Sequence, residues 1–220
     1  MLRLSVLILC LFWYSMSLAD QAPIEDRIRA LEPVIGMYPP HIDGEVELKT
    51  ITASYQSLKS ELDVLLAKDP ANQQLLFLRG HLQSMGHNFD YPGAWQGATT
   101  DLKAILEEHP DNIPALLELG ELWVNSDGSL AAGAEKLFIA AQCYTGKQPL
   151  EIAQRGIFFA LYYQGRLQEA YAQVTFLAET WPDQQIYKHL QAMTQSVIER
   201  SEAKPLLPEI LAMTSCHEVN

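Results

Sequence analysis

The sequence predicts an all-α fold, a solenoid in which helix-turn-helix units follow one another along the chain. Apolar residues recur at helical spacing through most of the 220 residues, and no stretch alternates apolar and polar residues for long enough to predict a sheet. Four prolines separated by 40, 39 and 33 residues stand between the helical segments, at Pro70, Pro110, Pro149 and Pro182. Because proline ends one helix and is tolerated in the first turn of the next, these positions are predicted to be joints in a repeated structure.

Residues 1–19 are predicted to be a signal peptide that is cleaved after Ala19. Arg3 provides a positive start, residues 4–14 are apolar, and Ser17-Leu18-Ala19 places small residues at the cleavage site. A membrane anchor needs about twenty apolar residues, which is longer than this run, although an uncleaved anchor remains the alternative. We therefore expect a periplasmic or secreted protein with no stable membrane insertion after cleavage.

Residues 20–53 are predicted to form an N-terminal capping helix and a linker. Ile28, Leu31 and Ile35 have the spacing of one helix face, and the helix is expected to cover 24–37. The end units of a repeat expose an apolar face that must be covered for solubility, which is the role expected of this helix.

Residues 54–200 are predicted to be the repeat domain. Asp111 and Asp183 follow prolines and are suited to capping the helices that come next. The helices expected after the first are 46–68, 71–86, 94–108, 113–125, 130–143, 149–163, 166–180 and 183–200.

The internal pattern of these units resembles the tetratricopeptide repeat (TPR) family. Gly165, Ala170, Val174, Leu177 and Pro182 follow the spacing Gly-x4-Ala-x3-apolar-x2-apolar-x4-Pro without a gap. The second half of the pattern recurs twice, at Ala98, Leu102, Ile105 and Pro110 and at Leu58, Leu62, Leu65 and Pro70. In a further unit, Leu119, Gly120 and Trp123 match the first helix and Ala134, Phe138 and Ala141 match the second. The resemblance implies a right-handed α-solenoid of TPR-like helix-turn-helix repeats with capping helices at both ends.

Two turns are longer than the TPR pattern requires. The interval from Gly80 to Ala98 holds about six extra residues, within the segment 85–95, and the turn at 126–129 holds about two. The longer segment presents three candidate contact residues for a partner: His87, Phe89 and Tyr91. The alternative is that its aromatic side chains pack on the neighbouring repeat, and Trp95 is expected in the core.

In TPR proteins, partners usually lie along the concave groove formed by the first helix of each pair. The resemblance places seven residues there: Phe77, His81, Leu117, Glu121, Arg155, Phe159 and Tyr162. Arg155 alone is basic in this set, so a clamp for a terminal carboxylate is not expected. For Phe159 and Tyr162, packing between repeats is the alternative.

The C-terminal tail, residues 201–220, is predicted to contain a short capping helix near 206–213. Export makes a disulfide between Cys143 and Cys216 one candidate. The alternative is that Cys143 is a small buried residue and Cys216 a free thiol.

Composition and motifs indicate a non-catalytic protein. The net charge of −12 would repel nucleic acid, so no nucleic-acid partner is expected. The chain lacks a Gly-x-Ser-x-Gly elbow, a phosphate loop, a dinucleotide fingerprint and a His-Glu-x-x-His motif, and its six histidines lack metal-ligand spacing. His87 and Asp90 could form an acid–base pair, but no nearby nucleophile is evident, and acids such as Glu118 and Glu121 are interpreted as solvated helix faces. We expect no catalytic residue, metal or cofactor.

The sequence thus predicts a protein–protein interaction module of the bacterial cell envelope, a TPR scaffold or assembly factor that binds a peptide or helix of another exported protein. The alternative is a small-molecule-binding protein or enzyme that uses the 85–95 loop and the concave groove. The oligomeric state is left open by the sequence.

Overall fold

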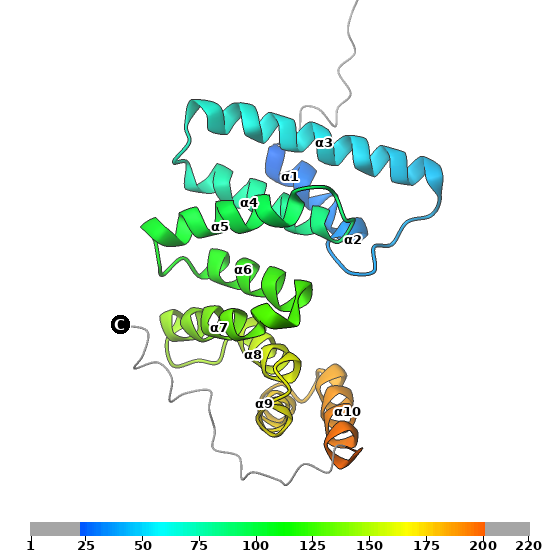
Figure 1. Cartoon of the computed structure of the whole chain (residues 1–220), viewed down its shortest axis with the longest axis vertical. Coiled ribbons are helices and arrows are strands. Elements are labelled where there is room, and N and C mark those ends of the chain that lie inside the picture. Colours follow the sequence, from blue (N-terminus) through cyan, green and yellow to red (C-terminus); the bar gives the residue numbers. More distant parts are fainter. Residues whose placement is uncertain (1–22, 201–220) are drawn as a thin grey trace, which may run out of the picture.

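The computed structural model describes residues 23–200, and this part of the chain contains helices and no strands. Figure 1 shows α3 at one end of the molecule and α9 and α10 at the other, with the remaining helices stacked between them. From α3 onward each helix contacts the next, which is the packing of an α-helical repeat. The elements are α1 (Ile24–Arg29), α2 (Glu32–Ile35), α3 (Glu45–Lys68), α4 (Gln73–His87), α5 (Ala94–Glu108), α6 (Ile113–Ser126), the 3₁₀ helix η2 (Gly128–Leu130), α7 (Ala131–Thr145), α8 (Glu151–Tyr163), α9 (Leu167–Thr180) and α10 (Gln185–Arg200).

The helix boundaries follow local capping chemistry. Asn72 and Asn112 each precede a helix, and their side-chain oxygens accept hydrogen bonds from the backbone N–H groups of Leu75 at 3.1 Å and Ala115 at 3.0 Å. Each bond satisfies a donor that the first turn of a helix leaves unpaired. Asn112 therefore caps α6, and the expectation that Asp111 does so is wrong because Asn112 is the residue directly before the first residue of the helix, Ile113.

The expected N-terminal helix over 24–37 is two shorter helices, α1 and α2. The break lies at Ala30 and Leu31, because Pro33 has no N–H for a helical bond and its ring clashes with the preceding turn. Pro33 instead lies at the start of α2, where proline is tolerated. Ile28 and Ile35 are nevertheless buried, as their spacing predicts, and they pack in one cluster with residues of α3 and α4.

The second helices of the repeats bury a regular row of apolar residues in the core. The apolar residues that repeat at regular spacing on α5, α7 and α9 are buried throughout: Ala98, Leu102, Ile105, Ala134, Phe138, Ala141, Ala170, Val174 and Leu177. Phe138 illustrates how the helices approach one another. Its ring lies against Gly120 of α6 and Gly156 of α8, where an added Cβ atom would stand 2.9 Å and 2.4 Å from ring atoms. Glycine at these two positions lets both helices close on one aromatic ring.

Several expectations fall outside the described residues, namely the signal peptide, the helix near 206–213 and Cys216. Cys143, on α7, is disulfide-bonded. Its pairing with Cys216 stays a prediction. Between residues 23 and 200, no helix has the length and apolar character that crossing a membrane requires.

Candidate binding face

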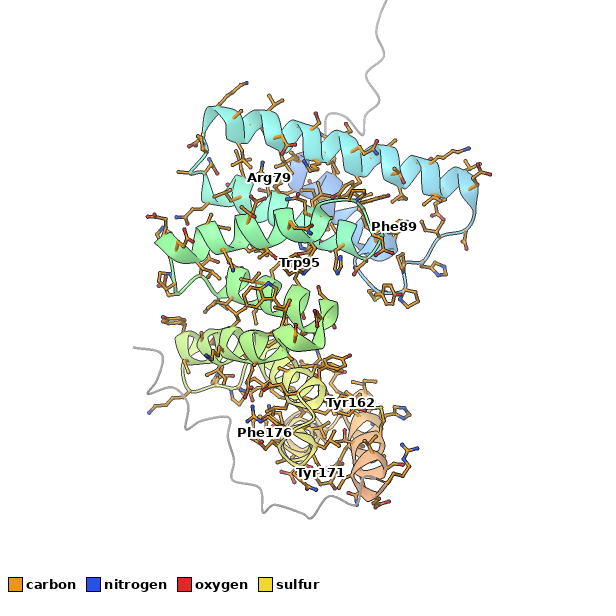
Figure 2. The ribbon with its side chains drawn as sticks, in the orientation of Figure 1. Arg79, Phe89, Trp95, Tyr162, Tyr171 and Phe176 are labelled. Atoms are coloured by element: carbon orange, nitrogen blue, oxygen red, sulfur yellow. The ribbon has the colours of Figure 1, made fainter. Side chains whose placement is uncertain are left out.

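Helices α4–α5, α6–α7 and α8–α9 form three successive pairs. Their first helices, α4, α6 and α8, lie next to one another, because α6 contacts both α4 and α8. All seven residues expected in the groove project from these helices, and each is half-buried: Phe77, His81, Leu117, Glu121, Arg155, Phe159 and Tyr162. Tyr162 marks the α8 end of this surface in Figure 2. We call the surface formed by these seven residues the α4–α6–α8 face.

The α4 side of the face is a cluster of charged groups around His81. The imidazole Nδ1 atom lies 3.1 Å from an oxygen of Glu118, and Nε2 lies 3.4 Å from an oxygen of Glu32. The ring of Phe77, one helical turn earlier, is stacked parallel to the imidazole at a centroid distance of 6.2 Å. Burial lowers the pKa of His81, but the two carboxylates outweigh burial, so the pKa is raised above its usual 6.5.

The charged cluster continues along the face to Arg155. Glu121, one turn after Glu118 on α6, lies 3.4 Å from the Arg155 guanidinium. Burial and the neighbouring Glu118 carboxylate raise the pKa of Glu121, against the opposing influence of Arg155. Side chains from four helices, α2, α4, α6 and α8, are thus linked electrostatically, with three acids facing one arginine and one histidine.

The α8 side of the face is aromatic. Phe159 lies 5.0 Å from the buried Phe158 in an edge-on arrangement and 6.3 Å from Tyr163 in a stacked one, measured between ring centroids. Tyr162 lies 5.9 Å from Tyr163. Phe159 and Tyr162 also pack against the core, whereas Tyr163 is 48% exposed. The two expected residues therefore take part in packing between helices and still border an exposed aromatic surface.

Three further residues contact members of this face and were not predicted from the sequence: Glu32, Glu118 and Tyr163. The interpretation of Glu118 as solvated is wrong, since its side chain is only 18% exposed and lies beside His81. Its spacing of three residues from Glu121 was the available signal, because such residues share a helix face. Glu32 carried no such signal, since its position depends on how α2 docks.

A second site, a shallow cavity of about 520 Å³ that is open to solvent, lies where the α4–α5 turn meets the α6–α7 turn. Its walls come from the two turns that exceed the repeat pattern. The first turn and the start of α5 contribute His87, Asp90, Tyr91, Trp95 and Gln96. The second turn contributes Ser126, Asp127 and Leu130.

Hydrogen bonding fixes the chemistry of His87 and Ser126. The Ser126 hydroxyl donates to the carbonyl oxygen of Leu122, which can only accept. The same hydroxyl oxygen lies 3.1 Å from His87 Nε2, and because its one proton is already committed, His87 must donate. The pair joins the end of α4 to the end of α6.

The aromatic residues of the 85–95 segment pack on the N-terminal helices. Phe89 and Tyr91 contact the cluster that contains Ile28 and Tyr55, and the ring centroids of Tyr55 and Tyr91 are 4.5 Å apart. The Tyr91 hydroxyl is 2.7 Å from the hydroxyl of Thr52 on α3. Trp95 is half-buried and packs against the core while also lining the cavity.

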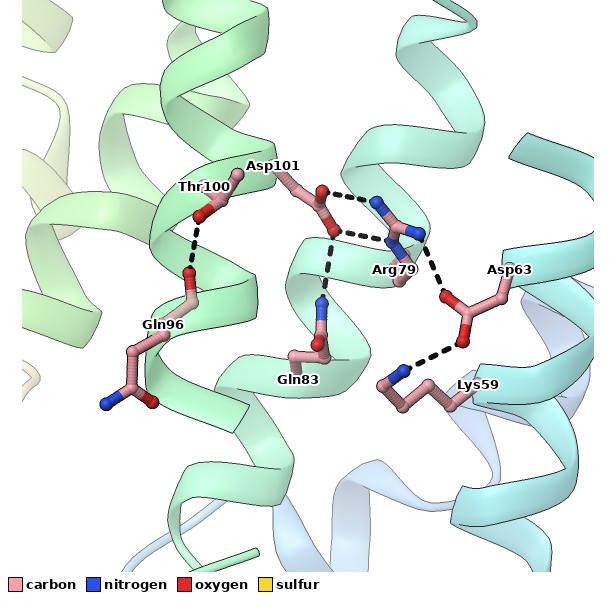
Figure 3. A network of polar contacts seen from close by, with 7 residues as sticks. All are labelled: Lys59, Asp63, Arg79, Gln83, Gln96, Thr100 and Asp101. Atoms are coloured by element: carbon pink, nitrogen blue, oxygen red, sulfur yellow. Dashed lines mark hydrogen bonds and ion pairs between the residues drawn. The ribbon is translucent and has the colours of Figure 1, made fainter. Parts of the chain in front are cut away.

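A third polar cluster, between α3, α4 and α5, is internally satisfied (Figure 3). Arg79 forms a two-pronged pair with the buried Asp101 at 2.8 Å and 2.7 Å, and it also donates to Asp63 at 2.8 Å. Gln83 donates to Asp101 and Lys59 to Asp63. Burial opposes ionisation of Asp63, but Lys59 and Arg79 outweigh it and lower its pKa. The groups in this network bind one another, so it is structural.

Within residues 23–200, no three or more His, Cys, Asp or Glu residues are grouped so as to hold a metal ion. No protein-family model matches the chain, and the searches of curated proteins and of solved structures also found no match.

Proposed function

We propose that this chain is a non-catalytic protein–protein interaction module, a TPR-type scaffold or assembly factor of the bacterial cell envelope. The α4–α6–α8 face carries the proposal. Three successive helix pairs present half-buried aromatic, acidic and basic side chains from their first helices. Ion pairs join His81 of α4 to Glu118 of α6, and Glu121 of α6 to Arg155 of α8. A continuous surface built from corresponding helices is how repeat proteins bind extended partners.

The chemistry of the face favours a particular kind of partner segment. Glu32, Glu118 and Glu121 give its α4 side an excess of acid over Arg155 and His81. Phe159 and Tyr163 offer rings on its α8 side. A peptide or helix of another exported protein, with a basic residue near one end and apolar residues near the other, matches both halves.

The test is photo-crosslinking in the cell. A crosslinking amino acid would replace Phe77 or Phe159 on the face and, as a matched control, Tyr171 on α9, which is also a half-buried aromatic. We expect one dominant exported protein to attach from Phe77 and Phe159 and not from Tyr171, with the attached peptide identified by mass spectrometry. Equal attachment from all three positions, or none, would contradict the proposal.

A further inference from the structure

The cavity between the α4–α5 and α6–α7 turns has features that the proposed protein-binding role does not use. Both turns exceed the length that closing a helix pair requires, by about six and about two residues. The two excesses lie in neighbouring repeats and meet around one space of about 520 Å³. Stacking of the two helix pairs places these turns side by side, and the extra residues of both line the space between them.

Three side chains of the cavity lining present acceptors, those of His87, Asp90 and Asp127. Ser126 gives its proton to a backbone carbonyl and receives one from His87 Nε2, and in this tautomer the lone pair of His87 is on Nδ1. Asp90 and Asp127 are both exposed carboxylates. A hydrogen bond from the Ser129 backbone N–H lowers the pKa of Asp127, which favours its ionised form. The cavity lining contains no lysine or arginine, so an anionic ligand would meet repulsion.

The apolar walls are held in place from behind. The Tyr91 ring is fixed by its hydroxyl contact with Thr52 and by its packing on Tyr55, and Trp95 packs on the core. Rings that packing already orders cost little entropy when a ligand binds. An aromatic face also attracts a cation that approaches it.

We infer that this cavity binds a small organic cation, with an ammonium group against Asp90 and Asp127 and an apolar body against Tyr91 and Trp95. The site lies at the turns and is separate from the contacts of the α4–α6–α8 face. It therefore does not depend on the proposed partner, and each can fail without the other.

The experiment compares isosteres of different charge on the purified protein. The cationic probes are phenethylammonium, choline and putrescine. Phenethyl alcohol and phenylacetate are the neutral and anionic counterparts of the first. The readout is the NMR signal of the Trp95 indole N–H, assigned with Trp95→Phe. We expect at least one cation to shift this signal at millimolar concentration, and the neutral and anionic counterparts to leave it unchanged.

Charge-removing variants test the assigned carboxylates. Asp90→Asn with Asp127→Asn should weaken cation binding at least about tenfold, the loss of one charge-assisted contact. Asparagine tolerates the positive φ of 53° at position 90 and can still accept the Ser129 hydrogen bond at 127, so the turns should persist. Asp111→Asn with Asp183→Asn, which changes two exposed aspartates at other joints, should leave binding unchanged. The inference is overturned if no cation shifts the signal, if phenethyl alcohol shifts it equally, or if both double variants bind alike.

Discussion

Asp63 and Asp101 bind the same guanidinium, that of Arg79, in different surroundings. The Asp101 side chain is 3% exposed, and that of Asp63 is 41% exposed. Removing one charge from a buried pair leaves the other uncompensated and costs about 3 kcal/mol, whereas an exposed pair contributes about 1 kcal/mol or less. Urea unfolding should therefore show a loss of about 3 kcal/mol for Asp101→Asn and at most about 1 kcal/mol for Asp63→Asn. Equal losses would mean that burial does not set the value of these pairs.

His81 should make the stability of the molecule depend on pH. Its pKa is raised in the folded chain by Glu118 and Glu32 despite burial. The folded state therefore binds this proton more tightly than the unfolded state. The resulting stabilisation is fully present below the unfolded pKa of about 6.5 and is lost as pH rises through the folded pKa. The raised pKa of Glu121 acts in the same direction.

The variant His81→Gln isolates this contribution. Its deficit in unfolding free energy relative to the parent should be larger at about pH 5.5 than at about pH 8.5. His109→Gln, at an exposed position after α5, controls for the loss of a histidine as such. A deficit that stays constant across this range, measured by chemical denaturation, would refute the ion pairs of His81 with Glu32 and Glu118.

At the scale of the element, the Phe138 ring of α7 packs against α6 and α8. It leaves little room for a larger residue at Gly120 or Gly156. Alanine in a helix is favoured over glycine by about 1 kcal/mol. A glycine-to-alanine substitution that causes no steric clash should therefore stabilise the folded protein. An added Cβ at Gly156 would stand 2.4 Å from the fully buried Phe138 ring, and one at Gly120 would stand 2.9 Å away. We expect Gly156→Ala to cost about 2 kcal/mol through overpacking, and Gly120→Ala to cost less.

Two further variants separate the clash from other effects. Gly80→Ala places its Cβ 3.1 Å from Leu102, a flexible side chain, and should be nearly neutral in thermal unfolding. Phe138→Leu combined with Gly156→Ala should lose less stability than the two single variants together, because the smaller side chain makes room. Additive losses in this double-mutant cycle would show that the glycine serves another purpose.

The elements that repeat were the ones that sequence predicted well. Helices α5 and α9 match their expected limits within one residue, because proline joints and apolar spacing act locally. The prediction of a single N-terminal helix was wrong because Pro33 lies inside an otherwise periodic segment. The spacing of apolar residues does not show that proline lacks the backbone N–H that a continuous helix needs. The sequence offered the 85–95 loop as part of a small-molecule site but not the contribution of the second turn, since this requires two turns about 40 residues apart in sequence to meet, as His87 and Ser126 do.

At the scale of the whole molecule, stacking of the helix pairs brings residues from corresponding helices onto one surface. Phe77 and Phe159 are 82 residues apart in sequence, and they come to one face because α4, α6 and α8 are successive first helices. The repeat pattern predicts which residues share this face, and all seven lie half-buried on α4, α6 and α8. It could not provide the ion pairs across it, because the contacts of His81 with Glu118 and Glu32 depend on how α6 and α2 dock.

The same stacking provides a matched test of the face within one chain. Phe159→Ala with Arg155→Glu removes a ring and reverses a charge on the α4–α6–α8 face. Phe176→Ala with Lys136→Glu makes equivalent changes on α9 and α7, at a half-buried ring and an exposed base. The first variant should lower capture of the crosslinked partner at least about tenfold, since buried aromatic and arginine contacts dominate interfaces, while circular dichroism shows unchanged helicity. The second should capture as the parent does. If the two variants behave alike, the partner does not bind through this face, and the turns around His87 and Ser126 become the surface to test next.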